Sequence, residues 1–183
     1  MATLVTVEEF RTLKDPPGVR LELHNGEVVE VTRPKYKHAL IQRRIFILFE
    51  TILSGRGRAF IEFTFRPYPE HEVRVADVGW VGRKREVQID LEDNLQGAPD
   101  IVVEVLSPSN TTSEMLTKKD LCFNAGCQQF WIVDPKAALI EVSLSDRTSR
   151  IFHRGDRIPL GDSFCSVDEI LDDVDYQLKS FDR

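Results

Sequence analysis

The stretch 98–109 limits the folds open to this chain more than any other. It holds an apolar run over 101–106 that only Glu104 interrupts, and the run stops at Ser107-Pro108. A run that is apolar on both faces is typical of a strand covered on both sides. A carboxylate inside such a run is costly unless it is paired or binds a cation. The stretch therefore predicts a core strand of an α/β sheet, with a functional acid where the strand opens into a loop.

Turn and capping signals predict the elements around this strand. Asn25-Gly26 predicts a hairpin over 20–31, because both turn positions must tolerate positive φ. A stripe of apolar residues from Ile41 to Ile52 predicts the longest helix, over 36–54. Capping boxes predict further helices that begin near Thr6, Thr111 and Ser166. Further strands are predicted at 58–66, 73–81, 129–133, 139–144 and 149–153, with a loop over 83–97 that has room for one helical turn. No linker or repeat divides the chain, so we expect one domain over 1–183.

Composition narrows the setting in which the protein works. No apolar run is long enough to span a bilayer, and the start of the chain lacks the layout of a signal peptide. Three cysteines without a C-x-x-C pair favour a reducing, cytoplasmic location. The net charge of −6 argues against nucleic acid, but residues 1–85 hold 15 Lys and Arg against 11 Asp and Glu. A basic face on an acidic protein therefore stays open beside the reading of scattered surface charge.

Three acids lie near the ends of apolar strands, namely Asp77, Asp100 and Glu104. Asp100 and Glu104 share a face of one strand but stand roughly 13 Å apart, which is too far for both to bind one ion directly. Asp77 and Glu104 become neighbours if their strands pair. Two adjacent carboxylates repel unless a cation lies between them, and Mg²⁺ or Mn²⁺ is the natural candidate. The alternative is that Asp77 sits at a bulge near Gly79 or pairs with an arginine.

Two lysines and one histidine could join these acids. Lys118 and Lys119 flank the centre of the apolar face of the helix that follows Thr111, where lysine is rarely found unless paired. One of them could reach the strand-end carboxylates and hold an attacking water, or both could extend along the surface into solvent. His38 points inward at the start of the longest helix, where most histidines are structural. Zinc-ligand spacing and phosphate-loop motifs are missing from the sequence.

Several motifs occur in the order of a known family. They are Glu22-Leu23-His24-Asn25-Gly26-Glu27, His38, Arg74-Val75-Ala76-Asp77-Val78, 99–109, Lys118, Ala125-Gly126 and Trp131-Ile132-Val133-Asp134-Pro135. From about residue 5 to 172 the chain resembles the Uma family of restriction-endonuclease-like proteins, in the PD-(D/E)XK nuclease superfamily. It departs from the family pattern at Ala76, where proline is common, and at Cys122 and Phe130, where tyrosine is usual.

The resemblance implies a fold and a set of site residues. The fold would be a mixed α/β (α+β) core, in which helices flank a central sheet of four to five strands, with peripheral hairpins and a short C-terminal tail. Asp77 and Glu104 would bind Mg²⁺ or Mn²⁺. Asp100, which its distance from Glu104 excludes as a direct ligand, keeps either an indirect role beside them or a structural one. The usual lysine is replaced by Leu106, and its role would pass to Lys118, with Lys119 as the alternative. Glu22 and His38 would complete the catalytic residues.

Three functions remain open at this point. The first is a metal-dependent DNA endonuclease that hydrolyses phosphodiester bonds, with DNA as partner, a homodimer as its plausible assembly and no membrane association. The second is a catalytically weak or inactive module of the same fold that binds nucleic acid or a partner protein; the acidic net charge and the missing in-strand lysine favour it. The third is a hydrolase that acts on another phosphate ester.

Overall fold

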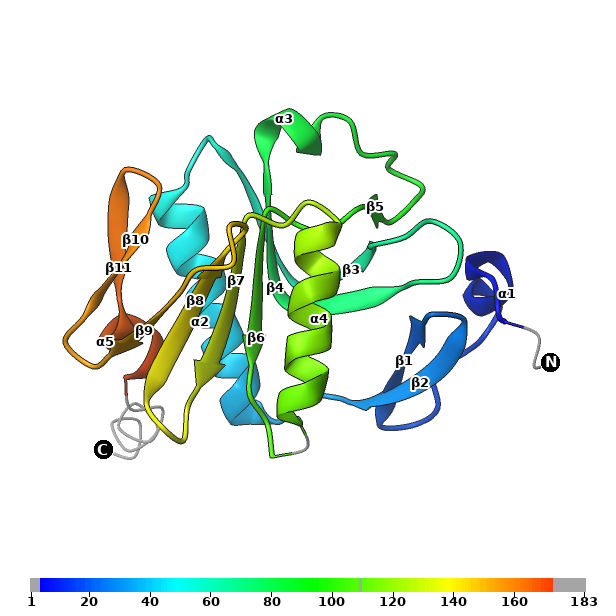
Figure 1. Ribbon diagram of the computed structural model, residues 1–183, viewed down its shortest axis with the longest axis horizontal. Coiled ribbons are helices and arrows are strands. Elements are labelled where there is room, and N and C mark those ends of the chain that lie inside the picture. The colour runs from blue at the N-terminus through cyan, green and yellow to red at the C-terminus, as the bar shows by residue number, and fades with distance from the viewer. Residues whose placement is uncertain (1–3, 109, 173–183) are drawn as a thin grey trace, which may run out of the picture.

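A mixed sheet of seven strands forms the centre of the protein (Figure 1). The computed structural model describes residues 4–108 and 110–172; Ser109 and the expected C-terminal tail lie outside the described residues. β6 and β7 run parallel, as do β3 and β5, and the other neighbours are antiparallel. This confirms the mixed fold class. The strands in spatial order are β5 (Leu95–Gln96), β3 (Gly57–Arg66), β4 (Arg74–Gly82), β6 (Ile101–Val105), β7 (Gln129–Asp134), β8 (Leu139–Leu144) and β9 (Ser149–His153).

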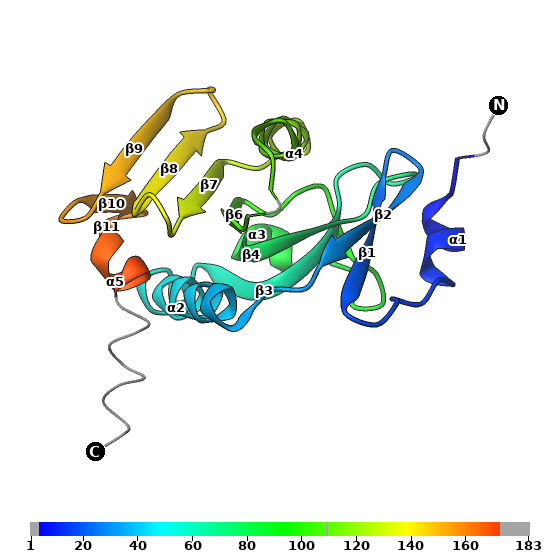
Figure 2. The same ribbon diagram turned by 90° about the horizontal axis from the view of Figure 1, so that it is seen from below.

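The two long helices cover opposite faces of this sheet (Figure 2). α2 (Tyr36–Ile52) lies on one face and α4 (Thr112–Asn124) on the other. The predicted capping box begins α4, with Thr111 and Glu114 as its two members. All five residues of β6 are buried, as the apolar run predicts for a strand covered on both sides.

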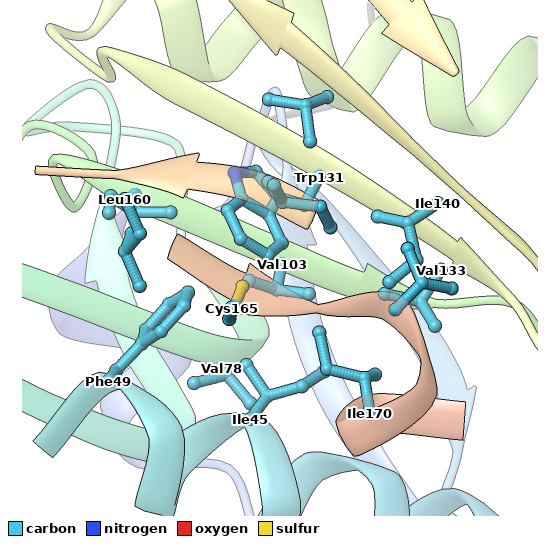
Figure 3. Close-up of a cluster of buried hydrophobic side chains, with 14 of the residues drawn as sticks. Ile45, Phe49, Val78, Val103, Trp131, Val133, Ile140, Leu160, Cys165 and Ile170 are labelled. Atoms are coloured by element: carbon cyan, nitrogen blue, oxygen red, sulfur yellow. The ribbon is translucent and has the colours of Figure 1, made fainter. Parts of the chain in front are cut away.

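Each face of the sheet has its own apolar core. On the α2 face, the ring of Phe49 meets Trp131 edge to face at a centroid distance of 5.4 Å, and Val78 and Val103 pack beside them (Figure 3). On the α4 face, Val102 packs with Phe130 and with the buried thiols of Cys122 and Cys127. Alternate residues of β6 thus supply both cores, which fixes the direction in which Glu104 points.

A separate hairpin stands beside the sheet next to the short helix α1 (Val7–Arg11). It consists of β1 (Val19–His24) and β2 (Glu27–Thr32), and Asn25 and Gly26 both have positive φ, as predicted for its turn. Leu23 and Val73 exchange two backbone hydrogen bonds of 2.9 Å. These bonds attach β1 to the start of β4 and bring Glu22 towards the sheet.

The structure adds elements that the sequence patterns did not predict. A second hairpin, β10 (Arg157–Leu160) with β11 (Ser163–Ser166), precedes α5 (Val167–Leu171) and packs against α2. Its strands are four residues long and one contains Pro159, so they give little periodic signal. The polar stretch 83–97 holds the helical turn α3 (Arg83–Glu86), which agrees with the single turn expected in this loop, and the two-residue strand β5, which was not expected. The central sheet is therefore wider than the four to five strands that the resemblance implies.

Candidate functional site

Asp77 and Glu104 meet where β4 and β6 separate. The last paired residues of the two antiparallel strands are Val78 and Val103, so the next residues along them are Asp77 and Glu104. The backbone N–H of Val105 donates a 2.7 Å hydrogen bond to Asp77 Oδ2, in place of a further bond between the strands. The two carboxylates lie close enough that the charge of Asp77 raises the pKa of Glu104.

Lys118 of α4 reaches both strands at this point. Its Nζ lies 2.8 Å from Glu104 Oε1 and donates a 2.8 Å hydrogen bond to the carbonyl of Val75. Lys118 is only 9% exposed, so its charge and that of Glu104 face each other away from solvent. Lys119 turns the other way, and its Nζ lies 3.0 Å from Glu141 Oε1 and 3.3 Å from Ser143 Oγ. The fold thus brings Lys118 to the carboxylates and directs Lys119 to β8.

Burial and charge give the members of this pair unusual pKa values. Burial raises the pKa of Glu104, because Lys118 offsets only part of the lost hydration and the charges of Asp77 and Glu22 add to it. Burial also disfavours the ammonium of Lys118, but Glu104 and Glu22 outweigh it and raise the pKa of Lys118. Lys118 is therefore held in its charged form.

Glu22 approaches from the hairpin. It is 3% exposed, and its carboxylate lies 3.1 Å from an Arg20 nitrogen and 3.0 Å from His24 Nε2. Burial alone would raise its pKa, but the charge of Lys118 and the contacts with His24 and Arg20 lower the pKa of Glu22 to about 2. Glu22 of the hairpin is therefore negatively charged at neutral pH, and its charge acts on Lys118.

Two residues of α2 hold Asp77 from the other side. His38 Nε2 lies 2.9 Å from the carbonyl of Val105 and 3.1 Å from Asp77 Oδ2. Burial disfavours its charged form, but the hydrogen bond and charge of Asp77 outweigh this and raise the pKa of His38. Gln42, which is 1% exposed, donates a 3.0 Å hydrogen bond from Nε2 to Asp77 Oδ1.

Gln42 also connects Asp77 to Glu62, a residue that no sequence motif singles out. Its amide donates to Glu62 Oε1, and Glu62 pairs with Arg20. Glu62 has a φ of 52° and stands opposite Asp77, and these two residues do not pair although Ile61 pairs with Val78 and Phe63 with Ala76 on either side. Gln42 carried a signal, because it stands four residues after His38 on the inward stripe of α2.

Asp100 lies at the opposite end of β6 from Glu104. Its carboxylate accepts a 2.7 Å hydrogen bond from the backbone of Gly82 and pairs with Arg85 Nη1 at 3.1 Å. Its contacts therefore belong to a different part of the sheet from those of Asp77 and Glu104, and they lend no support to the indirect role expected for Asp100.

The carboxylates fit a hard divalent ion that keeps part of its water shell. Within 4–108 and 110–172, no three Asp, Glu, His or Cys side chains form a ready cage for a metal. Mg²⁺ does not need one, because it usually binds one or two carboxylates and completes its shell with water and substrate phosphate. Glu104 Oε1 lies 2.8 Å from Lys118 Nζ, and a carboxylate has about four lone-pair sites, so the ion pair leaves acceptor capacity free. The donor set of Asp77 and Glu104 therefore matches Mg²⁺ or Mn²⁺.

Comparison with known proteins finds similarity to a family and to a structure that are both described as nucleases. The profile of the Uma2 family, described as "Putative restriction endonuclease", matches residues 7–168. One similar solved structure is a "putative nuclease belonging to DUF820" from Anabaena variabilis ATCC 29413, with a TM-score of 0.78 and 20% sequence identity. That match covers 91% of this chain and 97% of the other, and at this identity it bears on the fold alone. No curated protein matches the chain closely enough to count as a relative.

Proposed function

Given that the chain belongs to the Uma2 family, described as "Putative restriction endonuclease", we propose that it is a DNA endonuclease that hydrolyses phosphodiester bonds with Mg²⁺ or Mn²⁺. The observation that carries the proposal is the ion pair of 2.8 Å between Lys118 and Glu104 beside Asp77. Two carboxylates and one buried ammonium supply the charges that phosphodiester hydrolysis needs at one point. A bound divalent ion would polarise the phosphate and acidify a water molecule.

The carboxylates and the lysine would have different roles in this reaction. Asp77 and Glu104 hold the metal, and Val105 N–H and Gln42 fix the direction of the Asp77 carboxylate. Lys118 orients the attacking water and offsets negative charge on the phosphate. Its raised pKa argues against a role as a general base, because a base must lose its proton near neutral pH.

Glu22 and His38 would act through these groups. The negative charge of Glu22 keeps Lys118 protonated in a buried setting. His38 contacts both Asp77 and the carbonyl of Val105, so it holds the strand end and the carboxylate at a fixed separation. Because its pKa is raised, the imidazole of His38 could also act as a general acid that donates a proton to the leaving oxygen.

The test is cleavage of supercoiled plasmid and single-stranded DNA by the purified protein with Mg²⁺, with Mn²⁺ or with EDTA. We expect metal-dependent cleavage that falls at least about 100-fold in Asp77→Asn and Glu104→Gln. Glu70→Gln, at an exposed position, is the matched control and should cleave like the wild type. Equal residual cleavage in wild type and Glu104→Gln would show that the site is assigned wrongly.

One observation favours the alternative of a weak or inactive binding module. Lys118 already neutralises Glu104, so a metal must compete with a buried ammonium for the carboxylate. Salt-sensitive DNA binding without cleavage under any divalent ion would support this alternative. Cleavage of other phosphate esters, with DNA left intact, would instead support the wider hydrolase function.

Two further parts of the proposal concern assembly and location. A homodimer is proposed for the endonuclease, and sedimentation of the purified protein tests it. A reducing compartment such as the cytoplasm suits the chain, because Cys122, Cys127 and Cys165 are buried as free thiols. No helix in the described part of the chain is long and apolar enough to cross a membrane.

A further inference from the structure

A cavity of about 780 Å³ lies at the end of the sheet opposite the carboxylate site. Its lining includes Gly82, the last residue of β4, and Asp100, which precedes β6. Gly82 is five residues along β4 from Asp77, which corresponds to roughly 17 Å. A ligand in this cavity would therefore be separate from a phosphodiester held by Asp77 and Glu104.

The lining of this cavity is strongly basic on a chain of net charge −6. Four cations line it, namely Arg56, Arg83, Lys84 and Arg85, against the single carboxylate of Asp100. That carboxylate is already satisfied by Gly82 N–H and by Arg85. The cavity therefore holds a surplus of positive charge.

The remaining cations have little or no compensation within the protein. Arg56 pairs with Asp162 at 2.6 Å, but the Asp162 side chain is 86% exposed, so solvent screens the pair. Arg83 and Lys84 are exposed and have no ion-pair partner in the part of the chain that the structure describes. These two charges are the ones most available to an anion.

Hydrogen bonds and ion pairs hold the segments that carry these cations in place. Arg83 N–H donates a 2.8 Å hydrogen bond to the carbonyl of Arg56, which joins two lining segments. A Cβ added at Gly97 would stand 3.2 Å from Arg85 Nη2, and Arg85 Nη1 pairs with Asp100 at 3.1 Å, so two neighbours limit the movement of this guanidinium. Positively charged groups kept together in this way are prepared for a phosphate, whose oxygens accept several charge-assisted hydrogen bonds.

The same cavity has an apolar wall. Trp80 lines it together with Val87, a residue that is 73% exposed although it is apolar. Gln128 adds an amide at the edge. The volume falls within the usual range for small-molecule sites, roughly 300 to 1,000 Å³. A ligand that combines a phosphate with a flat apolar ring would satisfy both the basic and the apolar sides.

We propose that this cavity binds a small phosphate-bearing ligand of the nucleotide class, at a site independent of the carboxylate site. Arg83 and Lys84 contact the phosphate, Arg85 and Arg56 support them, and the ring lies against Trp80. The function of the carboxylate site is not needed for this binding. The two proposals can therefore fail separately.

The experiment is calorimetric titration of the full chain with three probes, a 5′-mononucleotide, the matching nucleoside and inorganic phosphate. We expect saturable binding of the mononucleotide, and at least tenfold weaker binding of the nucleoside and of phosphate alone. Arg83→Glu with Lys84→Glu should weaken the mononucleotide at least tenfold. Lys14→Glu with Lys136→Glu makes the same change of net charge at exposed positions elsewhere and should leave the affinity unchanged.

Fluorescence locates the binding. Trp131 is fully buried in the core, so a change of emission on adding the mononucleotide should come from Trp80 and vanish in Trp80→Phe. Because Trp80→Phe could alter packing, Arg83→Gln with Lys84→Gln provides a milder second variant, which should also lose affinity at an unchanged melting temperature. Asp77→Asn should bind the mononucleotide like the wild type.

Several results would overturn the proposal. The first is that the mononucleotide does not bind at millimolar concentration. The second is that the Arg83/Lys84 and Lys14/Lys136 variants lose equal affinity for the mononucleotide. The third is that inorganic phosphate binds as tightly as the mononucleotide. Binding confined to long DNA would equally overturn it, because the cavity would then be part of a polymer contact.

Discussion

Lys118 Nζ lies 2.8 Å from Glu104 Oε1, and the same ammonium donates to the carbonyl of Val75 at 2.8 Å. One side chain from α4 thus connects β4 and β6 at the point where the two strands separate. The neighbouring Lys119 makes the comparable contact with Glu141, at 3.0 Å, in a more exposed position. Lys118 is therefore the candidate site residue, and Lys119, on the same helix, serves as a control for the loss of a lysine–glutamate pair.

The first prediction uses this control. Lys118→Met leaves Glu104 buried without its partner, so we expect a loss of about 3 kcal/mol in the free energy of unfolding. Lys119→Met should cost less than about 1 kcal/mol, because its pair is partly solvated. Urea unfolding measures both values. The double variant Lys118→Met with Glu104→Gln should recover much of the loss, and equal effects of the two lysine variants would contradict the prediction.

The second prediction concerns Gln42, which donates to Asp77 Oδ1 at 3.0 Å. Gln42→Leu keeps most of the side-chain volume but removes this donor, so Asp77 can rotate away from a metal. We expect Mn²⁺ affinity to fall about 10- to 100-fold, as for other residues that orient metal ligands. Calorimetric titration with Mn²⁺ measures it. Gln88→Leu, at an exposed position, should have no effect, and an unchanged affinity in Gln42→Leu would remove Gln42 from the site.

The third prediction concerns stability at acid pH. The pKa of Glu22 falls from its ordinary value of 4.5 to about 2 in the folded protein. A lowered folded-state pKa adds stability above the unfolded-state pKa, and this contribution is lost as pH falls from about 4.5 towards 2. The full shift corresponds to about 3 kcal/mol. The stability difference between wild type and Glu22→Gln should therefore shrink across this window in urea unfolding at a series of pH values.

Glu70→Gln provides the comparison for this pH series. Glu70 is exposed, so its substitution should leave the slope of stability against pH like that of the wild type. A difference between wild type and Glu22→Gln that stays constant from pH 5 to pH 2 would mean that Glu22 is not held ionised by Lys118.

The sequence was sufficient to predict the central strand, and it predicted that Asp77 lies near Glu104 on the condition that their strands pair. A strand that is apolar on both faces must be covered on both sides, and two acids come near each other when they occupy facing positions of paired strands. The sequence could not choose between Lys118 and Lys119, because both flank the same face of the helix. The position of β4 distinguishes the two lysines, because Lys118 donates to the carbonyl of Val75 in β4 whereas Lys119 donates to Glu141 in β8.

One part of the support around Asp77 could not be predicted from the sequence. It includes Glu62, which accepts a hydrogen bond from Gln42 and has a φ of 52° at a position opposite Asp77. Glutamate gives no local signal for that conformation, unlike Asn25-Gly26, which predicted its turn correctly. For Asp100 the extended strand was informative: its distance from Glu104 along β6 predicted that the two acids cannot bind one ion directly, and their carboxylates lie at opposite ends of that strand.

The last prediction tests metal binding without relying on cleavage. Mg²⁺ or Mn²⁺ that binds only the folded protein raises its stability, by about 2.7 kcal/mol at a free concentration 100 times the dissociation constant. The melting temperature of the wild type should therefore rise with Mn²⁺ concentration and fall back with EDTA. Asp77→Asn should abolish the rise, because one of the two proposed carboxylate ligands becomes a neutral amide. Glu141→Gln removes the carboxylate of the neighbouring Lys119 pair and should retain the full rise. The same rise in Asp77→Asn as in wild type would place the ion elsewhere on the protein.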